Sequence, residues 1–395
     1  MKQLLVILIV LISGRSYGTV YTSFSDGNWS DSATWTPLGI PGDNDTIDIQ
    51  SNVLITSDFT IANCEMIVQN DASLSGSEIE FIGSYALNFG TMTFLEIQFS
   101  TDSYFSNSSG SICNCVLMRF NSSDGIGYNQ GWLNAGSLLI YGAFWINYGQ
   151  LDVSYFYYSG DNGFQNEGSM NCETLINGGN FINDSDTITA SYLFTYNDFE
   201  NRSLIIVTDS FKLNQDFINQ PWARIRASNF IGIDPTFRND GELICNHFTF
   251  PDGDVYGYGK ICISGCAELG GWISWDLDVC DLTPNGSCDT TYAGIDSTVT
   301  FCAVSPCEPL DLAESSEYLN WKVYPNPTEG WITIELSEQE DFRIQILDPS
   351  GKTVYQMRIN KEQSVNLNLK NLASGQYFLR LSSNRFSDTK KLHIR

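Results

Sequence analysis

The sequence predicts an all-β protein: a right-handed parallel β-helix of about 10 to 12 coils, followed by a small immunoglobulin-like β-sandwich. Three observations lead to this prediction. An aromatic residue, any residue and then asparagine recur at intervals close to nineteen residues through the middle of the chain. The residues after each asparagine alternate between polar and apolar, as they do in strands. Residues 318–395 show the same alternation without the repeat.

The repeat is clearest in consecutive copies of this motif. They are Trp145-Ile-Asn147, Phe164-Gln-Asn166, Phe181-Ile-Asn183, Phe199-Glu-Asn201, Phe217-Ile-Asn219 and Phe237-Arg-Asn239. Extending the register towards the N-terminus, with looser flanks, adds Asn129, Asn107, Asn88, Asn70 and Asn52. The intervals between successive asparagines run from 17 to 22 residues. A period of this size with short strands is typical of a solenoid whose coils lie one strand spacing, about 4.8 Å, apart.

The pattern inside the repeat also indicates strands. Asn-x-Gly-x-apolar-x-apolar occurs at 147–153, 166–172 and 239–245, with glycine supplying the turn before the strand. We expect the aromatic and apolar residues to point inward and to stack on their equivalents in neighbouring coils. The asparagines either form a hydrogen-bonded amide ladder along the axis or serve only as turn residues.

The N-terminal 18 residues have the features of a signal peptide. Lys2 precedes nine apolar residues, Leu4 to Ile12, and the small residues Ser16 and Gly18 follow. This run is too short to span a membrane, and we expect no membrane span elsewhere. Residues 19–48 are predicted to cap the coils of residues 49–275, with Trp29 and Trp35 covering the first open edge.

Nine of the eleven cysteines fall into two kinds. Cys113, Cys172 and Cys245 lie six residues after a repeat asparagine, where other coils have Phe94, Val153, Val207 and Ile225, so we expect them in the core. Six others crowd into a polar segment that runs into the connector, residues 276–317, and predict up to three disulfides of open connectivity. They are Cys262, Cys266, Cys280, Cys288, Cys302 and Cys307. CxxC spacing is absent, so a zinc site is not expected.

Residues 318–395 are predicted to be a separate domain behind a polar linker. Apolar residues alternate at 331–336, 342–347, 365–369 and 377–381, which predicts about six or seven short strands and a small β-sandwich. Short motifs stand in order along this tail. They are Tyr324-Pro325-Asn326-Pro327 with Gly330, Gly351-Lys352, Leu372, Gly375 with Tyr377, and Lys390-Lys391.

In these motifs the tail closely resembles the C-terminal sorting domain of type IX secretion cargo, of the type A subtype whose tail is removed at the outer membrane. The resemblance implies a β-sandwich, export across the outer membrane to the cell surface or the extracellular space, and the type IX translocon and sortase as partners. The start of the body, from Gly27 to Ile47, resembles that of secreted β-helix surface proteins.

The charge of the chain is unevenly distributed. Residues 19–317 hold 38 acidic and 7 basic residues, whereas residues 318–395 hold 8 acidic and 11 basic residues. Nucleic-acid binding depends on clustered Lys and Arg that neutralise phosphates, so the acidic body excludes this class of function. An acidic body is also a poor partner for anionic membrane surfaces.

Catalytic residues are hard to find in this composition. A lyase acting on acidic polysaccharides needs cations beside the uronate, and a glycoside hydrolase needs two carboxylates at a defined separation. The body has seven basic residues, and no pair among its carboxylates stands out by spacing. The best acid–base candidate is His247 with Asp252 and Asp254, for which a plain surface turn is the alternative.

Structural Ca²⁺ is the one metal that the sequence offers ligands for. The pairs Asp43/Asp45, Asp184/Asp186 and Asp252/Asp254 supply oxygen ligands, although none lies in an EF-hand loop or a Gly-Gly-x-Gly-x-Asp repeat. No other cofactor is expected, because nucleotide, phosphate-loop and zinc-hydrolase motifs are absent from the sequence.

Two hypotheses for the body follow. Tyr155-Phe-Tyr-Tyr158 places rings on both faces of a strand, and outward rings can stack on sugars, although alternate core and corner positions would explain the same run. The preferred hypothesis is a non-enzymatic adhesin, matrix component or glycan-binding scaffold, with extracellular glycans as partners. The alternative is a polysaccharide lyase or glycoside hydrolase of the β-helix class, which would need a groove with converging polar groups on one face.

Overall fold

The computed structural model describes residues 18–233, 235–282, 291–303, 307, 321–328, 330–336, 341–347, 353–360, 364–370, 372–382 and 387–394. The chain divides into two compact units, Met1–Leu310 and Asp311–Arg395. Apart from Gly18, the predicted signal peptide lies outside the described residues. Within the described part of the chain, no helix is long and apolar enough to cross a membrane.

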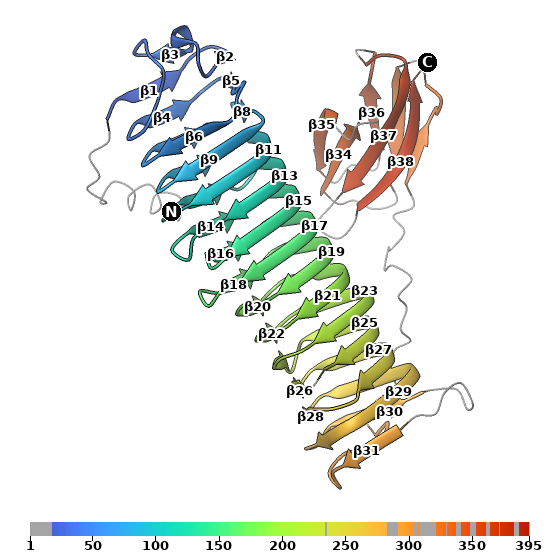
Figure 1. The fold of residues 1–395 in the computed structure, drawn as a ribbon. Helices are drawn as coiled ribbons and strands as arrows, with labels where there is room; N and C mark the ends of the chain where they lie inside the picture. The colour runs from blue at the N-terminus through green and yellow to red at the C-terminus, as the bar shows by residue number, and fades with distance from the viewer. Residues whose placement is uncertain are drawn as a thin grey trace. The chain divides into compact units, whose positions relative to one another are not determined.

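The first unit is a parallel β-helix on one 31-stranded sheet, which confirms the predicted fold class. Most coils contain one long and one short strand, each paired in parallel with its counterparts in the neighbouring coils (Figure 1). The long strands are β11 (Thr91–Ser100), β13 (Ile112–Phe120), β15 (Trp132–Tyr141), β17 (Gln150–Ser159), β19 (Ser169–Asn177), β21 (Ile188–Thr195), β23 (Leu204–Leu213), β25 (Arg224–Gly232), β27 (Glu242–Phe250) and β29 (Lys260–Ser274).

The short strands carry the repeat motif or its equivalent. They are β4 (Thr46–Ile49), β7 (Glu65–Val68), β10 (Tyr85–Asn88), β12 (Tyr104–Asn107), β14 (Ile126–Asn129), β16 (Phe144–Asn147), β18 (Phe164–Asn166), β20 (Phe181–Asn183), β22 (Phe199–Asn201), β24 (Phe217–Asn219), β26 (Thr236–Asn239) and β28 (Asp254–Tyr256). In the first coils the long strand is divided into β5 (Asn52–Leu54) with β6 (Phe59–Ala62), and β8 (Ser73–Ser75) with β9 (Glu78–Ile82).

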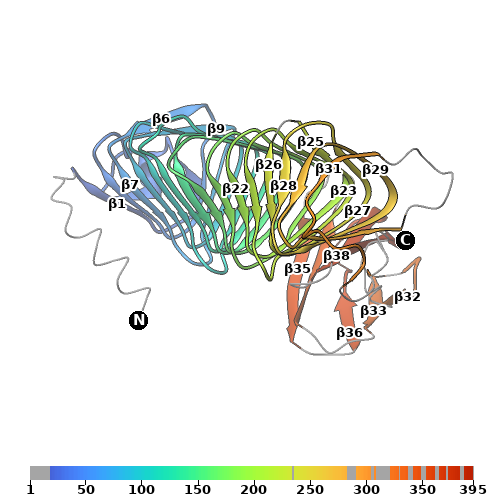
Figure 2. The same cartoon turned by 90° about the horizontal axis from the view of Figure 1, so that it is seen from below.

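The solenoid has about thirteen turns, more than expected, because parallel pairing continues beyond the predicted repeats. Strand β1 (Val20–Ser23) pairs in parallel with β4, so the predicted cap supplies part of a coil. At the other end, β30 (Asp278–Asp281) and β31 (Thr291–Ile295) pair in parallel with β29. Figure 2 shows the coils following one another as a row of loops.

Tryptophans close the N-terminal end of the solenoid. Strands β2 (Gly27–Asn28) and β3 (Trp35–Thr36) flank a short 3-10 helix at Ser32–Thr34, whose first turn is capped by the Asp31 carboxylate. The rings of Trp29 and Trp35 are buried and pack edge to face with centroids 5.0 Å apart. Trp35 Nε1 donates to the carbonyl of Trp29 at 2.9 Å, so its polar atom is paired inside the cap.

Inside the coils, the motif aromatics form a continuous stack. Phe181 lies 4.7 Å from Phe164 and 4.5 Å from Phe199, and Phe199 lies 5.1 Å from Phe217, all as stacked rings. These side chains are at most 2% exposed. The inward orientation expected from the alternation therefore holds.

The repeat asparagines form a buried amide ladder. From Asn88 to Asn219, each side-chain Nδ2 donates to Oδ1 of the asparagine in the following coil, at 2.7 to 2.9 Å, so that the ladder ends at Asn239. In the two preceding coils the same position is held by Val68 and Ile49. The assignment of Asn70 and Asn52 to the repeat is therefore wrong: Asn52 is exposed on β5, and Asn70 lies in the turn after β7.

The cysteine slot, six residues after the repeat asparagine in most other coils, lies two residues further along the chain in two coils. Cys172 and Cys245 lie in the same inward column as Phe94 and Val153. Cys115 occupies this column, whereas Cys113 lies in the neighbouring one, because the turn after Asn107 is longer. Ile225 is displaced to the neighbouring column in the same way, and Ala227 takes its place. Cys113 and Cys245 are buried free thiols, and Cys172 is partly buried against the core.

Two disulfides close the last coils. They are Cys262–Cys307 and Cys280–Cys302, with Cα atoms 5.8 and 4.5 Å apart. Cys266 is also disulfide-bonded, and Cys288 lies outside the described residues. Ile244 packs against Cys262 and Cys280 in a small cluster of its own.

The second unit contains two antiparallel sheets around one core, as predicted for a β-sandwich. The smaller sheet contains β32 (Lys322–Tyr324), β33 (Trp331–Glu335) and β36 (Ser364–Asn368). The larger contains β34 (Asp341–Leu347), β35 (Thr353–Asn360), β37 (Gly375–Ser382) and β38 (Ser387–Ile394).

Candidate functional site

The predicted acid–base group is spread along the solenoid surface. His247 lies on the outer side of β27, and its Nε2 approaches Gly265 of the next coil so closely that a Cβ there would lie 3.4 Å away. Asp252 lies in the turn beyond the end of β27, where its Oδ1 accepts from the backbone N–H of Gly253 at 3.1 Å. Asp254 begins β28 and is exposed. The contacts of the described residues do not join the imidazole to either carboxylate.

The other predicted calcium ligands accept backbone hydrogen bonds. Asp45 accepts from the N–H groups of Thr19 and Gly42 at 2.8 and 2.9 Å, and Asp43 accepts from Ala62 at 2.8 Å. Asp186 accepts from the N–H of Thr187 at 2.7 Å. Among the described residues, no group of three acidic, histidine or cysteine side chains is arranged to hold a metal ion.

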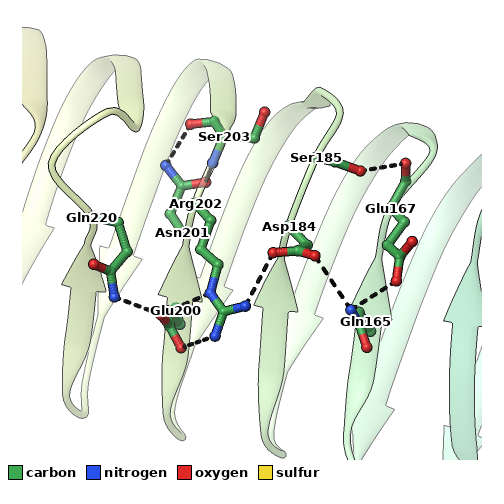
Figure 3. Close-up of polar contacts among 9 residues, drawn as sticks. All are labelled: Gln165, Glu167, Asp184, Ser185, Glu200, Asn201, Arg202, Ser203 and Gln220. Atoms are coloured by element: carbon green, nitrogen blue, oxygen red, sulfur yellow. Dashed lines mark hydrogen bonds and ion pairs between the residues drawn. The ribbon is translucent and has the colours of Figure 1, made fainter.

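Asp184 belongs instead to a polar network across four coils (Figure 3). Arg202 donates to Asp184 at 3.1 Å and, through two nitrogens, to Glu200 at 2.9 and 3.1 Å. Gln220 donates to Glu200 from one side, and Gln165 to Asp184 from the other. The hydrogen bond from Arg202 is the main reason that the pKa of Glu200 lies below its usual value. This network fixes the charged outer surface of the short strands.

Aromatic side chains gather on the outer side of the long strands. Phe156 and Tyr158 are fully buried, whereas Tyr155, which alternates with them, is 37% exposed. We define the tyrosine face as these outward rings of β15, β17 and β21 and the residue after β21. Its members are Tyr141, Tyr155, Tyr157, Tyr192, Phe194 and Tyr196.

The tyrosine face is braced by ring and hydroxyl contacts. Tyr141 and Tyr157 have centroids 5.6 Å apart, and Tyr196 donates from its hydroxyl to that of Tyr157 at 2.9 Å. Tyr196 reaches across the intervening coil because Gly178 has no side chain there: a Cβ would lie 2.3 Å from the Tyr196 hydroxyl. Burial, followed by the hydrogen bond with Tyr157, raises the pKa of Tyr196 well above its usual value. The face is thus a fixed, ring-lined surface with hydroxyl groups.

A pocket of about 280 Å³ lies near the C-terminal end of the solenoid. Its rim includes Trp222 and Tyr258, which are 74% and 63% exposed. Its polar lining comprises Arg224, Glu242, Lys260, Asp276 and Asp278. Residue types alone missed this site, but the interval of 20 residues between Asn219 and Asn239 signals the inserted turn that carries Trp222.

In the second unit, the predicted motif residues meet at the last strand. Asn326 donates to the carbonyl of Lys391 at 2.7 Å and accepts from the N–H of His393 at 2.9 Å. Lys390 donates to the carbonyl of Trp321 at 2.6 Å, and its ammonium lies 4.5 Å from that ring centroid. The Tyr-Pro-Asn-Pro segment is thereby tied to β38, although the two motifs stand more than sixty residues apart.

The remaining motif residues support this sandwich. Tyr324 hydrogen-bonds Glu335 through its hydroxyl, and Tyr377 donates to the carbonyl of Ala373 at 2.9 Å. Leu372 packs against the core. Gly330 has φ = +105°, a backbone conformation that favours glycine. Gly351 and Lys352 lie outside the described residues.

The chain thus consists of a β-solenoid followed by a separate compact domain that carries the predicted sorting motifs. A family model for the secretion system C-terminal sorting domain matches residues 322–395. No curated protein matches the chain. The chain is therefore type IX secretion cargo, exported across the outer membrane to the cell surface or the extracellular space, and its tail interacts with the type IX machinery.

Proposed function

We propose that the body is a non-enzymatic glycan-binding protein that acts as an adhesin or matrix scaffold outside the cell. The tyrosine face is the observation that carries this proposal. Soluble proteins seldom expose a group of aromatic rings without a binding role, and a sugar can place its C–H face on a ring while its hydroxyls bond to tyrosine hydroxyls.

Charge narrows the class of glycan. The body holds 38 acidic and 7 basic residues, so a polyanionic chain would be repelled. Among the contacts of the described residues, one basic group lies over a ring of the tyrosine face: the Lys212 ammonium, 5.5 Å from the Tyr192 centroid. Neutral glycans are the partner class that this surface favours.

Glycan-array binding and calorimetry with the full exported chain test the proposal. We expect binding to neutral oligosaccharides, and a loss of at least about tenfold in affinity, worth about 1.4 kcal/mol, for Tyr155→Ala or Tyr192→Ala. Tyr148→Ala is the matched control, because Tyr148 is 43% exposed but lies in the turn after β16. Equal losses for all three variants, or none, would contradict the assignment.

We further propose that a sortase removes the sorting domain at the outer membrane. This proposal rests on the resemblance to the type A subtype and on the separate compact unit that begins at Asp311. Mass spectrometry of the exported protein should find a C-terminus upstream of Trp321. A mature form that ends in Lys391-Leu-His-Ile-Arg395 would contradict removal but not export.

A polysaccharide-cutting enzyme is the second candidate, and the pocket is the observation that favours it. Glu242, Asp276 and Asp278 all line this pocket, and glycoside hydrolases use paired carboxylates. The full chain should be incubated with neutral and acidic polysaccharides, and reducing ends and unsaturated uronates measured. Products that disappear in Glu242→Gln would establish the enzyme, whereas binding without products supports the scaffold.

A further inference from the structure

We propose that the pocket between Trp222 and Tyr258 binds one neutral sugar unit, as a second glycan site separate from the tyrosine face. The choice of a carbohydrate as ligand rests on the proposed function. The location of the site and its preference for a neutral ligand rest on the geometry and the charges of the pocket itself. The two glycan sites lie on different parts of the coil, since the tyrosine face follows the long strands and the pocket surrounds the turns that precede them.

An inserted turn places the first ring. Most asparagine intervals in the ladder are 17 to 19 residues, whereas that from Asn219 to Asn239 is 20 and contains Pro221 and Trp222. Trp222 is the most exposed of the tryptophans described here, at 74%. Together with Tyr258, which lines the same pocket and is 63% exposed, Trp222 offers a ring face on which a sugar can stack.

The second ring is held in position by its neighbours. Tyr258 packs against Trp275 with centroids 5.4 Å apart, and its N–H donates to Asp240 at 3.2 Å. Asp240 is itself engaged by Arg238 at 2.7 Å, and the Arg238 guanidinium lies 5.9 Å from the Trp275 ring. This support limits the motion of Tyr258, so little entropy is lost when a ligand stacks on it.

Bare backbone lies between the rings. A Cβ on Gly241 would lie 2.2 Å from the carbonyl oxygen of Ala223, and one on Gly259 would lie 2.2 Å from that of Gly241. Only glycine therefore fits at both turns, and both glycines line the pocket. Trp222 and Tyr258 belong to turns separated by one coil, or about 10 Å at two strand spacings. The hollow is small, about 280 Å³, just below the roughly 300 to 1,000 Å³ of pockets for drug-sized ligands, so it suits a single ring.

The charged lining favours a neutral ligand. Arg224 forms an ion pair with Glu242 at 2.7 Å, and Lys260, Asp276 and Asp278 complete the set. Asp278 is 2% exposed and accepts from Thr300 Oγ1 at 2.8 Å, so it belongs to the wall rather than to the open surface. Three carboxylates against two cations leave the lining net negative, which disfavours a uronate or phosphate. Donors and acceptors together match the hydroxyl groups of a sugar.

The test is a titration of the full chain with neutral monosaccharides and their trisaccharides, followed by tryptophan fluorescence and calorimetry. We expect saturable binding that weakens at least tenfold in Trp222→Ala and in Tyr258→Ala. Trp272→Ala is the matched control, since Trp272 is 49% exposed and lies outside the pocket lining. Unchanged thermal melts for Trp222→Ala would show that its loss of binding is local.

Three outcomes would overturn the inference. They are unchanged affinity in both pocket variants, tighter binding of glucuronate than of neutral sugars, and a loss as large in Trp272→Ala. The two glycan sites can fail separately. If only Tyr155→Ala and Tyr192→Ala weaken binding, the pocket inference fails while the proposed function stands. If only the pocket variants weaken it, the tyrosine face is refuted and the pocket stands.

Discussion

The early coils and the middle coils of the solenoid share one backbone but differ in what fills it. At the end of the short strand, the early coils have Ile49 and Val68, whereas the middle coils have asparagine from Asn88 to Asn239. The parallel pairing continues without a break across this change. The amide ladder is therefore not required for coils to stack. Its contribution is to pair the polar side chains that the middle coils bury.

The inward column beside this position differs too. Ile47 and Met66 occupy it in the early coils, where later coils have Phe164 and its stacked successors. An aliphatic column and an aromatic column thus support the same coil. Coil geometry follows from backbone pairing, while the energy of each coil depends on its own side chains.

The largest effect that would test this comparison is the loss of a stacked ring. Phe199→Ala should lower the free energy of unfolding by roughly 3–5 kcal/mol, because the cavity would lie between two rings in contact with it. Urea denaturation measures the change. Asp216→Ala, in an exposed position just before β24, is the control and should stay within about 0.5 kcal/mol. Equal effects would mean that the stack does not stabilise the middle coils.

The second prediction concerns the ladder. Asn183→Leu should cost roughly 2–4 kcal/mol, because it removes the acceptor of Asn166 and the donor to Asn201, which breaks the ladder and leaves the buried Asn166 Nδ2 without its acceptor. Val68→Asn should behave differently. Oδ1 of Asn88 is buried without a hydrogen-bond partner, and an asparagine at position 68 would supply the missing donor.

We therefore expect Val68→Asn to stay within about 1 kcal/mol of the native chain by urea denaturation. The comparison between early and middle coils fails if Val68→Asn destabilises the chain as much as Asn183→Leu does.

Rising pH should lower the stability of the early coils and of the middle coils over different pH ranges. Burial raises the pKa of Cys64, in the early coils, from 9.0 to about 11, and that of Tyr158, in the middle coils, from 10.0 to about 12. Each group holds its proton more tightly in the folded chain, so its stabilisation is complete below the unfolded pKa and is lost as pH rises through the folded pKa. The expected windows are pH 9 to 11 for Cys64 and pH 10 to 12 for Tyr158.

Unfolding free energies measured across this range check the assignment. Cys64→Ala should remove the dependence in the lower window and Tyr158→Phe that in the upper one. An unchanged pH profile in both variants would show that other groups govern alkaline unfolding.

The smallest effect is expected on the outer surface. Arg202→Gln removes the ion pairs with Asp184 and Glu200 but leaves partly exposed groups that water can solvate, so the cost should stay within about 1 kcal/mol. The cost should also shrink as salt is added. A loss comparable to that of Phe199→Ala would mean that the surface network, rather than the core, holds the middle coils together.

Repetition explains why much of this fold could be predicted. The motif copies from Trp145 to Asn239 place ring and amide at fixed steps, and the structure stacks them in that register. Prediction failed where the turns change length or the side chain changes type. Spacing alone assigned Asn70 and Asn52 to the ladder, whereas Val68 and Ile49 occupy the ladder position in the structure. The longer turn after Asn107 moved Cys113 out of the slot that Cys115 occupies.

The candidate sites were less predictable, because they depend on residues from several coils. The alternation of Tyr155 with Phe156 indicated outward rings. The hydrogen bond between Tyr157 and Tyr196 could not be predicted, because the sequence does not show that a tyrosine side chain reaches across the intervening coil. Trp222, Tyr258 and Glu242 are unremarkable as isolated residues. Only the coil register brings them to one pocket.

The amide ladder gives the solenoid an electrical direction. Every carboxamide in it donates towards the following coil, so the amide dipoles point the same way from Asn88 to Asn239. Aligned dipoles add, as in a helix, and leave partial negative charge on the free oxygen of Asn88 and partial positive charge at the N–H end. That end donates to the carbonyl of Lys260 at 2.9 Å. In an α-helix the positive pole lies at the N-terminus, whereas here it lies at the C-terminal end of the row. The two ends of the amide ladder thus carry partial charges of opposite sign.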